Sequence, residues 1–163
     1  MMSRLDEHSK KLNSIGWIVE KADYELSIPE EVRGRYVWLP IDIIEFLEGF
    51  SVVATGDEKS WFLTSKEIVG YSETAFAWNQ WELDSLEAAG NDSTWASAIR
   101  SFWDQHFPIL MSVREGYKFL AVRRYDLKIV GGAEPEFEEV VVVANSFKDL
   151  LQNIDKGVAD AFI

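Results

Sequence analysis

The chain has 163 residues, of which 47% are hydrophobic and 13% aromatic, a composition typical of a folded globular protein. Its net charge of -12, from 28 acidic and 16 basic side chains, argues against nucleic-acid binding, which needs a field of lysine and arginine. The absence of cysteine excludes thiol catalysis, disulfides and cysteine-based zinc sites. No apolar run approaches the roughly 20 residues of a membrane span, and no secretory signal pattern opens the chain. We therefore expect one cytoplasmic domain over residues 1–163 that does not enter a membrane.

The N-terminal part of the chain predicts short helices and one β-hairpin. Pro29, followed by two acids, favours a helix start, and Pro40 opens the segment IDIIEFLEG, whose apolar residues recur at helical spacing until Gly49. The turn Gly56-Asp57-Glu58-Lys59 lies between two apolar stretches, which indicates a hairpin. The expected elements are helices over residues 4–13 and 40–49, a short helix or turn over 29–34, a brief helical turn over 65–70, and strands over 51–54 and 61–63.

The stretch from 71 to 106 is both aromatic and acidic. Two helices fit it: Trp78 to Ala89, ended by Gly90, and Trp95 to His106, capped by Asp92 or Ser93 and stopped by Pro108. With a lone Arg100, the stretch mixes aromatic and acidic residues, among them Phe76, Trp78, Trp81, Trp95, Phe102, Trp103, Glu73, Glu82, Asp84, Glu87, Asp92 and Asp104.

A run of strands is predicted after this stretch. Ile109 to Val113 is the first strand, with its turn at Arg114-Glu115-Gly116. Alternating apolar residues then predict strand, turn and strand, and Gly131-Gly132 with Pro135 predicts a second turn. The run Val140 to Val143 is β-branched on both faces, so we expect a central or covered strand. The alternating residues are Phe119, Ala121, Tyr125, Leu127 and Ile129.

A helix is predicted to close the domain. Phe147, Leu150, Leu151 and Ile154 form one helical stripe, and Ser146 with Asp149 three residues later resembles a capping box. The stripe must pack on the preceding strands. The fold class is therefore α+β, a mostly antiparallel sheet with helices packed on it and a C-terminal amphipathic helix closing the domain.

The inventory of catalytic groups is poor. No HExxH, GxSxG, P-loop or dinucleotide-binding fingerprint occurs, so we expect no enzyme, no cofactor and no metal site. There are two histidines, and His106 at the end of a predicted helix is more typical of a dipole partner or a packed ring than of a general base. Carboxylate neighbours such as Glu138-Glu139 leave a carboxylate-dependent enzyme open as a minor alternative.

Seven tryptophans and dispersed carboxylates favour a protein-binding role, in which aromatic rings anchor and acids steer a basic partner. The alternative is that most of these rings belong to the core, and that the acids from Glu134 to Glu139 form a solvated edge that discourages strand pairing. The candidate partner-binding residues are Trp78, Trp81, Glu82, Asp84 and Glu87. The oligomeric state, monomer or homodimer, is left open.

Three stretches resemble the SUKH superfamily, which includes the fungal cell-wall-assembly regulators and many bacterial proteins. The first is Leu39-Pro40 before IIEFL, which is similar to the family's "LP" and the helix that follows it. The second is Trp61-Phe62-Leu63 with Glu67-Ile68, which is similar to the family's next strand and short helix. The third is VVVANSFKDLLQNI, similar to the closing strand and helix. Together they cover residues 35 to about 155. The chain departs from the family in having Glu48-Gly49-Phe50 where an Asn-Gly-Gly turn is usual, and a longer 71–106 stretch.

This resemblance implies a non-catalytic binding domain, and for bacterial members an immunity protein that neutralises a toxin by occluding it. Many such toxins are basic nucleases, and an acidic inhibitor can present carboxylates where the toxin binds phosphates. A basic toxin domain is therefore the expected partner. The alternative is a regulatory or scaffold domain, like the fungal relatives, that binds an endogenous protein.

Overall fold

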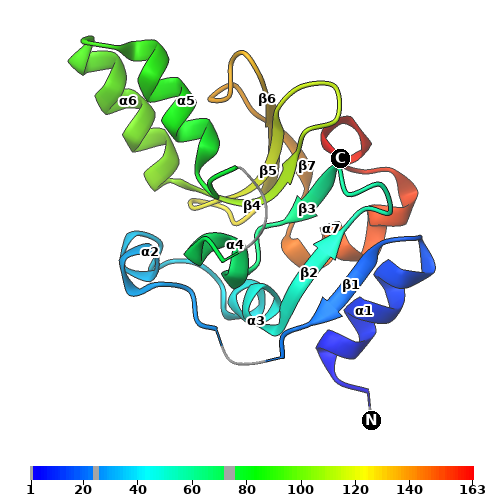
Figure 1. The fold of residues 1–163 in the computed structure, drawn as a ribbon. Helices are drawn as coiled ribbons and strands as arrows, with labels where there is room; N and C mark the ends of the chain where they lie inside the picture. Colours follow the sequence, from blue (N-terminus) through cyan, green and yellow to red (C-terminus); the bar gives the residue numbers. More distant parts are fainter. Residues whose placement is uncertain (1, 24–25, 72–75) are drawn as a thin grey trace.

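In a computed structural model of the chain, residues 2–23, 26–71 and 76–163 are described, so Glu73 lies outside the described residues. In this part of the chain, one antiparallel sheet of seven strands runs in chain order from β1 to β7 (Figure 1). The strands are β1 (Ile18–Lys21), β2 (Phe50–Ala54), β3 (Ser60–Phe62), β4 (His106–Ser112), β5 (Lys118–Arg123), β6 (Ile129–Ala133) and β7 (Val141–Ala144). The helices are α1 (Arg4–Ser14), α2 (Glu30–Arg35), α3 (Ile41–Gly49), α4 (Ser65–Val69), α5 (Gln80–Ala89), α6 (Ser93–Asp104) and α7 (Phe147–Asn153), with two 3-10 turns, η1 (Ile154–Lys156) and η2 (Asp160–Phe162).

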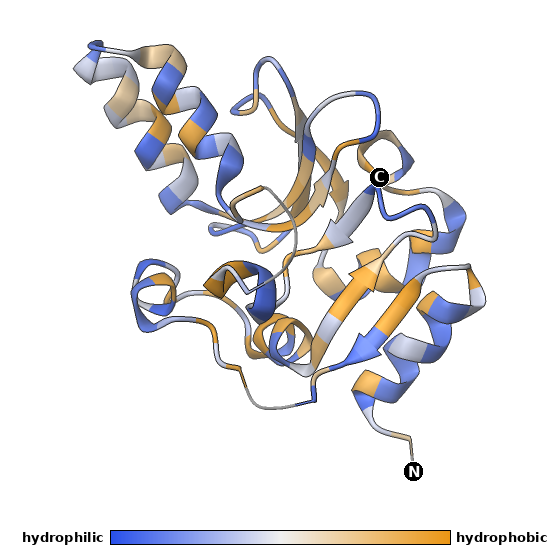
Figure 2. Ribbon diagram, in the orientation of Figure 1, coloured by the Kyte–Doolittle hydropathy of each residue, from blue (hydrophilic) through white to orange (hydrophobic). Residues whose placement is uncertain are grey.

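Both faces of the sheet are covered, as the side chains of β5 show. Its side chains alternate: Phe119 and Ala121 enter the core under α5 and α6, whereas Leu120 and Val122 enter the core shared with α1, α3 and α7. In Figure 2, β2 is mostly orange, β1 is orange in its first half and blue at its end, and α5 and α6 carry alternating blue and orange bands, as expected for helices with one buried face. The predicted α+β class, with helices packed on an antiparallel sheet, is confirmed.

The closing helix α7 forms as predicted. The Ser146 hydroxyl accepts a hydrogen bond from the backbone N–H of Asp149 at 3.0 Å, and the Asp149 carboxylate accepts one from the N–H of Asn145 at 2.9 Å. Phe147 and Leu150 are buried, so the apolar stripe of α7 lies on the sheet. The Ser146 hydroxyl thereby satisfies one of the donors that a helix start leaves unpaired, and the Asp149 carboxylate binds the residue before the cap.

The predicted helices of the N-terminal part correspond to α1, α2, α3 and α4, and the predicted hairpin to β2 and β3. The two helices of the aromatic, acidic stretch correspond to α5 and α6. Gly90 ends α5 and Asp92 caps α6, accepting a hydrogen bond from the N–H of Trp95 at 3.0 Å. His106 was expected to end this second helix but begins β4 instead.

The prediction of a turn at Gly131-Gly132 is wrong, because both residues lie inside β6. A Cβ on Gly131 would stand 2.5 Å from the ring of Phe162, and one on Gly132 would stand 2.5 Å from the ring of Phe119. Glycine is needed here for close packing of aromatic rings on the strand and not for a reversal of the chain.

The prediction that Val140 to Val143 form a central or covered strand is also wrong. β7 is the outermost strand and pairs only with β6 among the described strands, and Val141 and Val142 are 58% and 47% exposed. β-branched side chains fit the strand conformation, so the valines predict a strand correctly but do not tell whether that strand is covered. Similarly, Tyr125 and Leu127 were expected on a strand face but lie exposed in the turn between β5 and β6.

Candidate functional site

The helical hairpin α5–α6 projects from one end of the sheet (Figure 1) and is attached to it by two buried indoles. The rings of Trp81 and Trp103 stack with centroids 6.2 Å apart, and both pack against Phe119 of β5, at 5.3 Å and 4.9 Å. Trp81 is 0% exposed and Trp103 is 2% exposed. These contacts fix the position of the hairpin relative to the sheet and bury much of its apolar surface.

A buried ion pair ties the same hairpin to α2. Arg35 donates two hydrogen bonds to the Glu82 carboxylate, at 2.8 Å and 2.7 Å, and a third to Asp104 at 2.8 Å. The hydrogen bonds to Glu82, with that to Asp104, raise the pKa of Arg35 above its ordinary value. Glu82 is only 5% exposed, so Arg35 neutralises a carboxylate that would otherwise be buried without a partner.

Between the α5–α6 hairpin and the loop before β7 lies a groove of about 640 Å³, which we call the acidic groove. Five carboxylates line it, and no lysine, arginine or histidine does so within the described ranges. Three aromatic rings, those of Trp95, Tyr117 and Phe137, add apolar surface, and Trp95 is 49% exposed. The carboxylates belong to Asp84, Glu134, Glu136, Glu138 and Glu139.

The carboxylates of the acidic groove are crowded. Burial raises the pKa of Glu138, against the effect of the hydrogen bond that it accepts from the Ser85 hydroxyl at 3.1 Å. A side-chain hydrogen bond with Glu136 raises the pKa of Glu139, and repulsion between the two charges adds to it. Glu134 accepts a hydrogen bond from the backbone N–H of Tyr117 at 3.1 Å, which holds the loop against β5. A cation placed in the groove would relieve this repulsion.

The structure separates the five residues predicted to bind a partner. Asp84 lines the acidic groove and Glu87 is exposed on α5. Trp78 is partly buried between Tyr36 and Phe107, with centroids 6.3 Å away in both cases. Trp81 and Glu82 are buried, the first in the hairpin core and the second in the ion pair with Arg35. A partner of this folded state cannot reach these two, so their place in the predicted interface is corrected to a structural role.

Sequence reasoning missed the groove residues outside α5. Trp95 could have been found, because the buried residues of α6 are Ala96, Ile99 and Trp103, spaced i, i+3 and i+7, and Trp95 lies off that stripe. The acids from Glu134 to Glu139 were predicted to form a solvated edge. No local signal indicates that their loop folds towards α5, since that proximity depends on the tertiary packing of the hairpin.

His106 is a packed ring, one of the two roles predicted for it. It is 8% exposed, stacks on Phe102 with centroids 3.9 Å apart, and its Nδ1 lies 2.7 Å from the Phe102 carbonyl oxygen. Burial lowers its pKa below the ordinary value. Among the residues that the structure describes, no three His, Asp or Glu side chains are grouped so as to hold a metal ion. Nor does any described helix have the length and apolar character to cross a membrane.

Comparison with known proteins found no family model that matches the chain, and no match among curated proteins or solved structures. The resemblance to the SUKH superfamily therefore rests on the three motifs in the sequence. In the structure these motifs occupy α3, the β3–α4 segment and the β7–α7 segment.

Proposed function

We propose that this protein is a non-catalytic binding protein that neutralises a basic toxin domain, and that the acidic groove is where the toxin binds. The observation that carries the proposal is the composition of the groove: five carboxylates and the exposed ring of Trp95 line one concavity of about 640 Å³. Carboxylates attract lysine and arginine, and an exposed tryptophan offers both apolar area and a face for a cation. A basic protein surface is the partner that this chemistry fits.

The identity of the partner as a toxin follows from the resemblance to the SUKH superfamily. Inhibition would occur by occlusion, because a bound acidic protein covers the basic surface with which a nuclease contacts phosphates. The net charge of -12 would also accelerate the encounter of the two proteins at low salt. A scaffold domain that binds an endogenous partner remains the alternative, and it would use the same groove without a toxic target.

The test is co-purification from native cell lysate with three tagged proteins. They are the wild type, a groove variant (Glu136→Gln, Glu138→Gln, Glu139→Gln) and a control variant (Glu20→Gln, Glu30→Gln, Glu31→Gln). The three control acids are exposed and do not line the acidic groove. Each variant loses three negative charges, so the two are matched in net charge. Bound proteins are identified by mass spectrometry, and their retention is recorded as the salt concentration rises.

We expect one basic protein that the wild type and the control variant retain, that rising salt releases, and that the groove variant fails to retain. Equal loss from both variants would attribute binding to overall charge. Equal retention by all three would remove the groove from the interface. Several housekeeping proteins in place of one basic protein would favour the scaffold alternative.

A further inference from the structure

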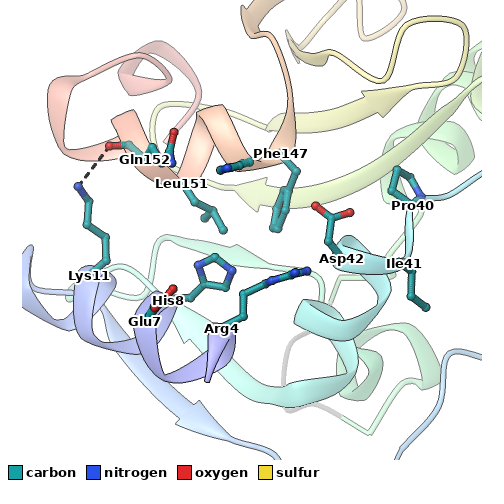
Figure 3. Close-up of a pocket in the computed structure, with 11 residues that line it drawn as sticks. Arg4, Glu7, His8, Lys11, Pro40, Ile41, Asp42, Phe147, Leu151 and Gln152 are labelled. Atoms are coloured by element: carbon teal, nitrogen blue, oxygen red, sulfur yellow. Dashed lines mark hydrogen bonds between the residues drawn. The ribbon is translucent and has the colours of Figure 1, made fainter. Parts of the chain in front are cut away.

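A second cavity, of about 650 Å³, lies on the other side of the sheet, where α1, the start of α3 and α7 meet (Figure 3). Helix α1 supplies Arg4, Glu7, His8 and Lys11, which are spaced i, i+3, i+4 and i+7 and so share one face of the helix. Helix α7 faces them and contributes Phe147, Lys148, Leu151 and Gln152. A volume of this size is within the range of small-molecule sites, roughly 300–1,000 Å³.

The bottom of this helix cavity is apolar. Phe147 and Leu151 are both 4% exposed and point into the space that the His8 ring enters from the other side (Figure 3). The ring of His8 contacts Phe46 edge to face, with centroids 5.7 Å apart. Burial, with the charge of Arg4, lowers the pKa of His8. Ile41, at the edge of the cavity, is 63% exposed and extends the apolar surface outwards.

The charges around the helix cavity differ from those of the rest of the protein. Three cations line it, Arg4, Lys11 and Lys148, against two carboxylates, Glu7 and Asp42, in a chain of net charge -12. The Asp42 carboxylate lies in the first turn of α3, where the helix dipole already stabilises it. Among the residues that line the cavity, cations therefore outnumber carboxylates, and they belong to two helices that face each other.

Two of these cations are available to a ligand. Lys11 is held by Asp155 at 3.0 Å and by the carbonyl oxygen of Gln152 at 3.2 Å. In the part of the chain that the structure describes, Arg4 forms a loose ion pair with Glu45, at 3.7 Å, in which the side chains are 62% and 55% exposed. Such exposed pairs contribute little and are readily exchanged for a better partner. Lys148 is exposed on α7 and also lines the cavity.

We propose that the helix cavity binds a small amphiphilic carboxylate, whose apolar body lies on Phe147 and Leu151 and whose carboxylate is bound by Arg4 and Lys148. The apolar floor provides affinity through buried area, and the two flexible cations select the sign of the head group. A cationic amphiphile of the same length would meet Arg4 and Lys148 as repulsive neighbours. This site is separate from the acidic groove and does not depend on its role.

The chain provides its own internal control, because it has two histidines and only His8 lines the cavity. Sodium decanoate is titrated into the isotopically labelled protein while the ring resonances of His8 and His106 are followed by NMR. Decyltrimethylammonium is titrated in parallel as a probe with the same apolar length and the opposite charge. We expect decanoate to shift His8 in a saturable manner and to leave His106 in place.

Variants then test the two cations. Arg4→Gln with Lys148→Gln should weaken decanoate binding about tenfold or more, as expected for the loss of charge-assisted hydrogen bonds. The matched control, Lys10→Gln with Arg33→Gln, removes the same two charge types from exposed positions outside the cavity and should change affinity by less than about twofold. Equal losses in both variants, equal binding of the cationic probe, or no saturable shift of His8 would overturn the proposal. Retention of the wild-type NMR spectrum outside the cavity shows that each variant is folded.

Discussion

Replacing Arg35 by methionine should strongly destabilise the fold. The substitution keeps a side chain of similar length but removes the two hydrogen bonds, at 2.8 Å and 2.7 Å, that neutralise the Glu82 carboxylate. The Glu82 carboxylate is then left without Arg35 in a position where its side chain is 7% exposed. The carboxylate must either take up a proton or draw water into the contact between α2 and the α5–α6 hairpin, and both cost free energy.

The magnitude follows from the degree of burial. Removing one partner of a fully buried ion pair costs about 3–5 kcal/mol. Because the Arg35 side chain is 26% exposed, water already solvates part of this pair, and we expect the lower end, about 3 kcal/mol. Replacing both Arg35 and Glu82 by methionine leaves no buried charge, so the double variant should recover about 2 kcal/mol of that loss.

Urea unfolding of the wild type, the two single variants and the double variant measures this coupling directly. Glu87→Gln is the control, because Glu87 is an exposed acid on the same helix and should change the free energy of unfolding by less than about 0.5 kcal/mol. If Arg35→Met were as harmless as the control, or if the single effects simply added in the double variant, the structural role given to Glu82 would be wrong. Glu82 would then return to the candidate interface.

Three further predictions concern packing, capping and pH. Gly132→Ala should destabilise the protein by about 1–3 kcal/mol through overpacking against the Phe119 ring. Gly34→Ala is the control, because a Cβ there meets no atom within 4 Å, and it should be neutral or stabilising by up to about 1 kcal/mol. Equal changes in the free energy of urea unfolding for the two glycine variants would contradict the packing argument. Ser146→Ala removes the cap of α7 and should cost about 1 kcal/mol by the same measurement; no change would mean that the cap is not formed. Because burial lowers the pKa of His106, the unfolded state binds this proton more tightly than the folded state does. The free energy of unfolding should therefore fall as the pH drops through about 6.5, and His106→Asn should remove part of that decline. An unchanged decline in the variant would contradict the role given to His106.

The sequence predicted the elements of this fold well where the signal was local. The helix stripe that begins at Phe147, with Ser146 as its cap, is a pattern within a few residues of the chain, and α7 forms there. Pro40 and Gly49 likewise bound α3. Such signals depend on backbone conformation and on one buried face, both of which can be read from neighbouring residues.

Predictions failed where the environment of a residue depends on a distant segment. Gly131 lies in a strand that pairs with β5 and β7, and glycine is needed there because the ring of Phe162 packs against it. Val141 is exposed because no described strand follows β7 in the sheet, which is a property of the topology. For the candidate site, the acids of α5 can be read from the sequence, but the burial of Glu82 depends on Arg35, more than forty residues earlier in the chain. The acidic groove as a whole required two segments that only tertiary packing brings together.

The measurement that tests the central claim most directly is a growth assay with the basic partner identified by co-purification. The partner is expressed in cells with the wild type, with the groove variant or with the charge-matched control variant. If the protein neutralises a toxin through the acidic groove, the partner alone arrests growth, the wild type and the control variant restore it, and the groove variant does not. A partner that leaves growth unaffected, or three proteins that restore growth equally, would contradict the account.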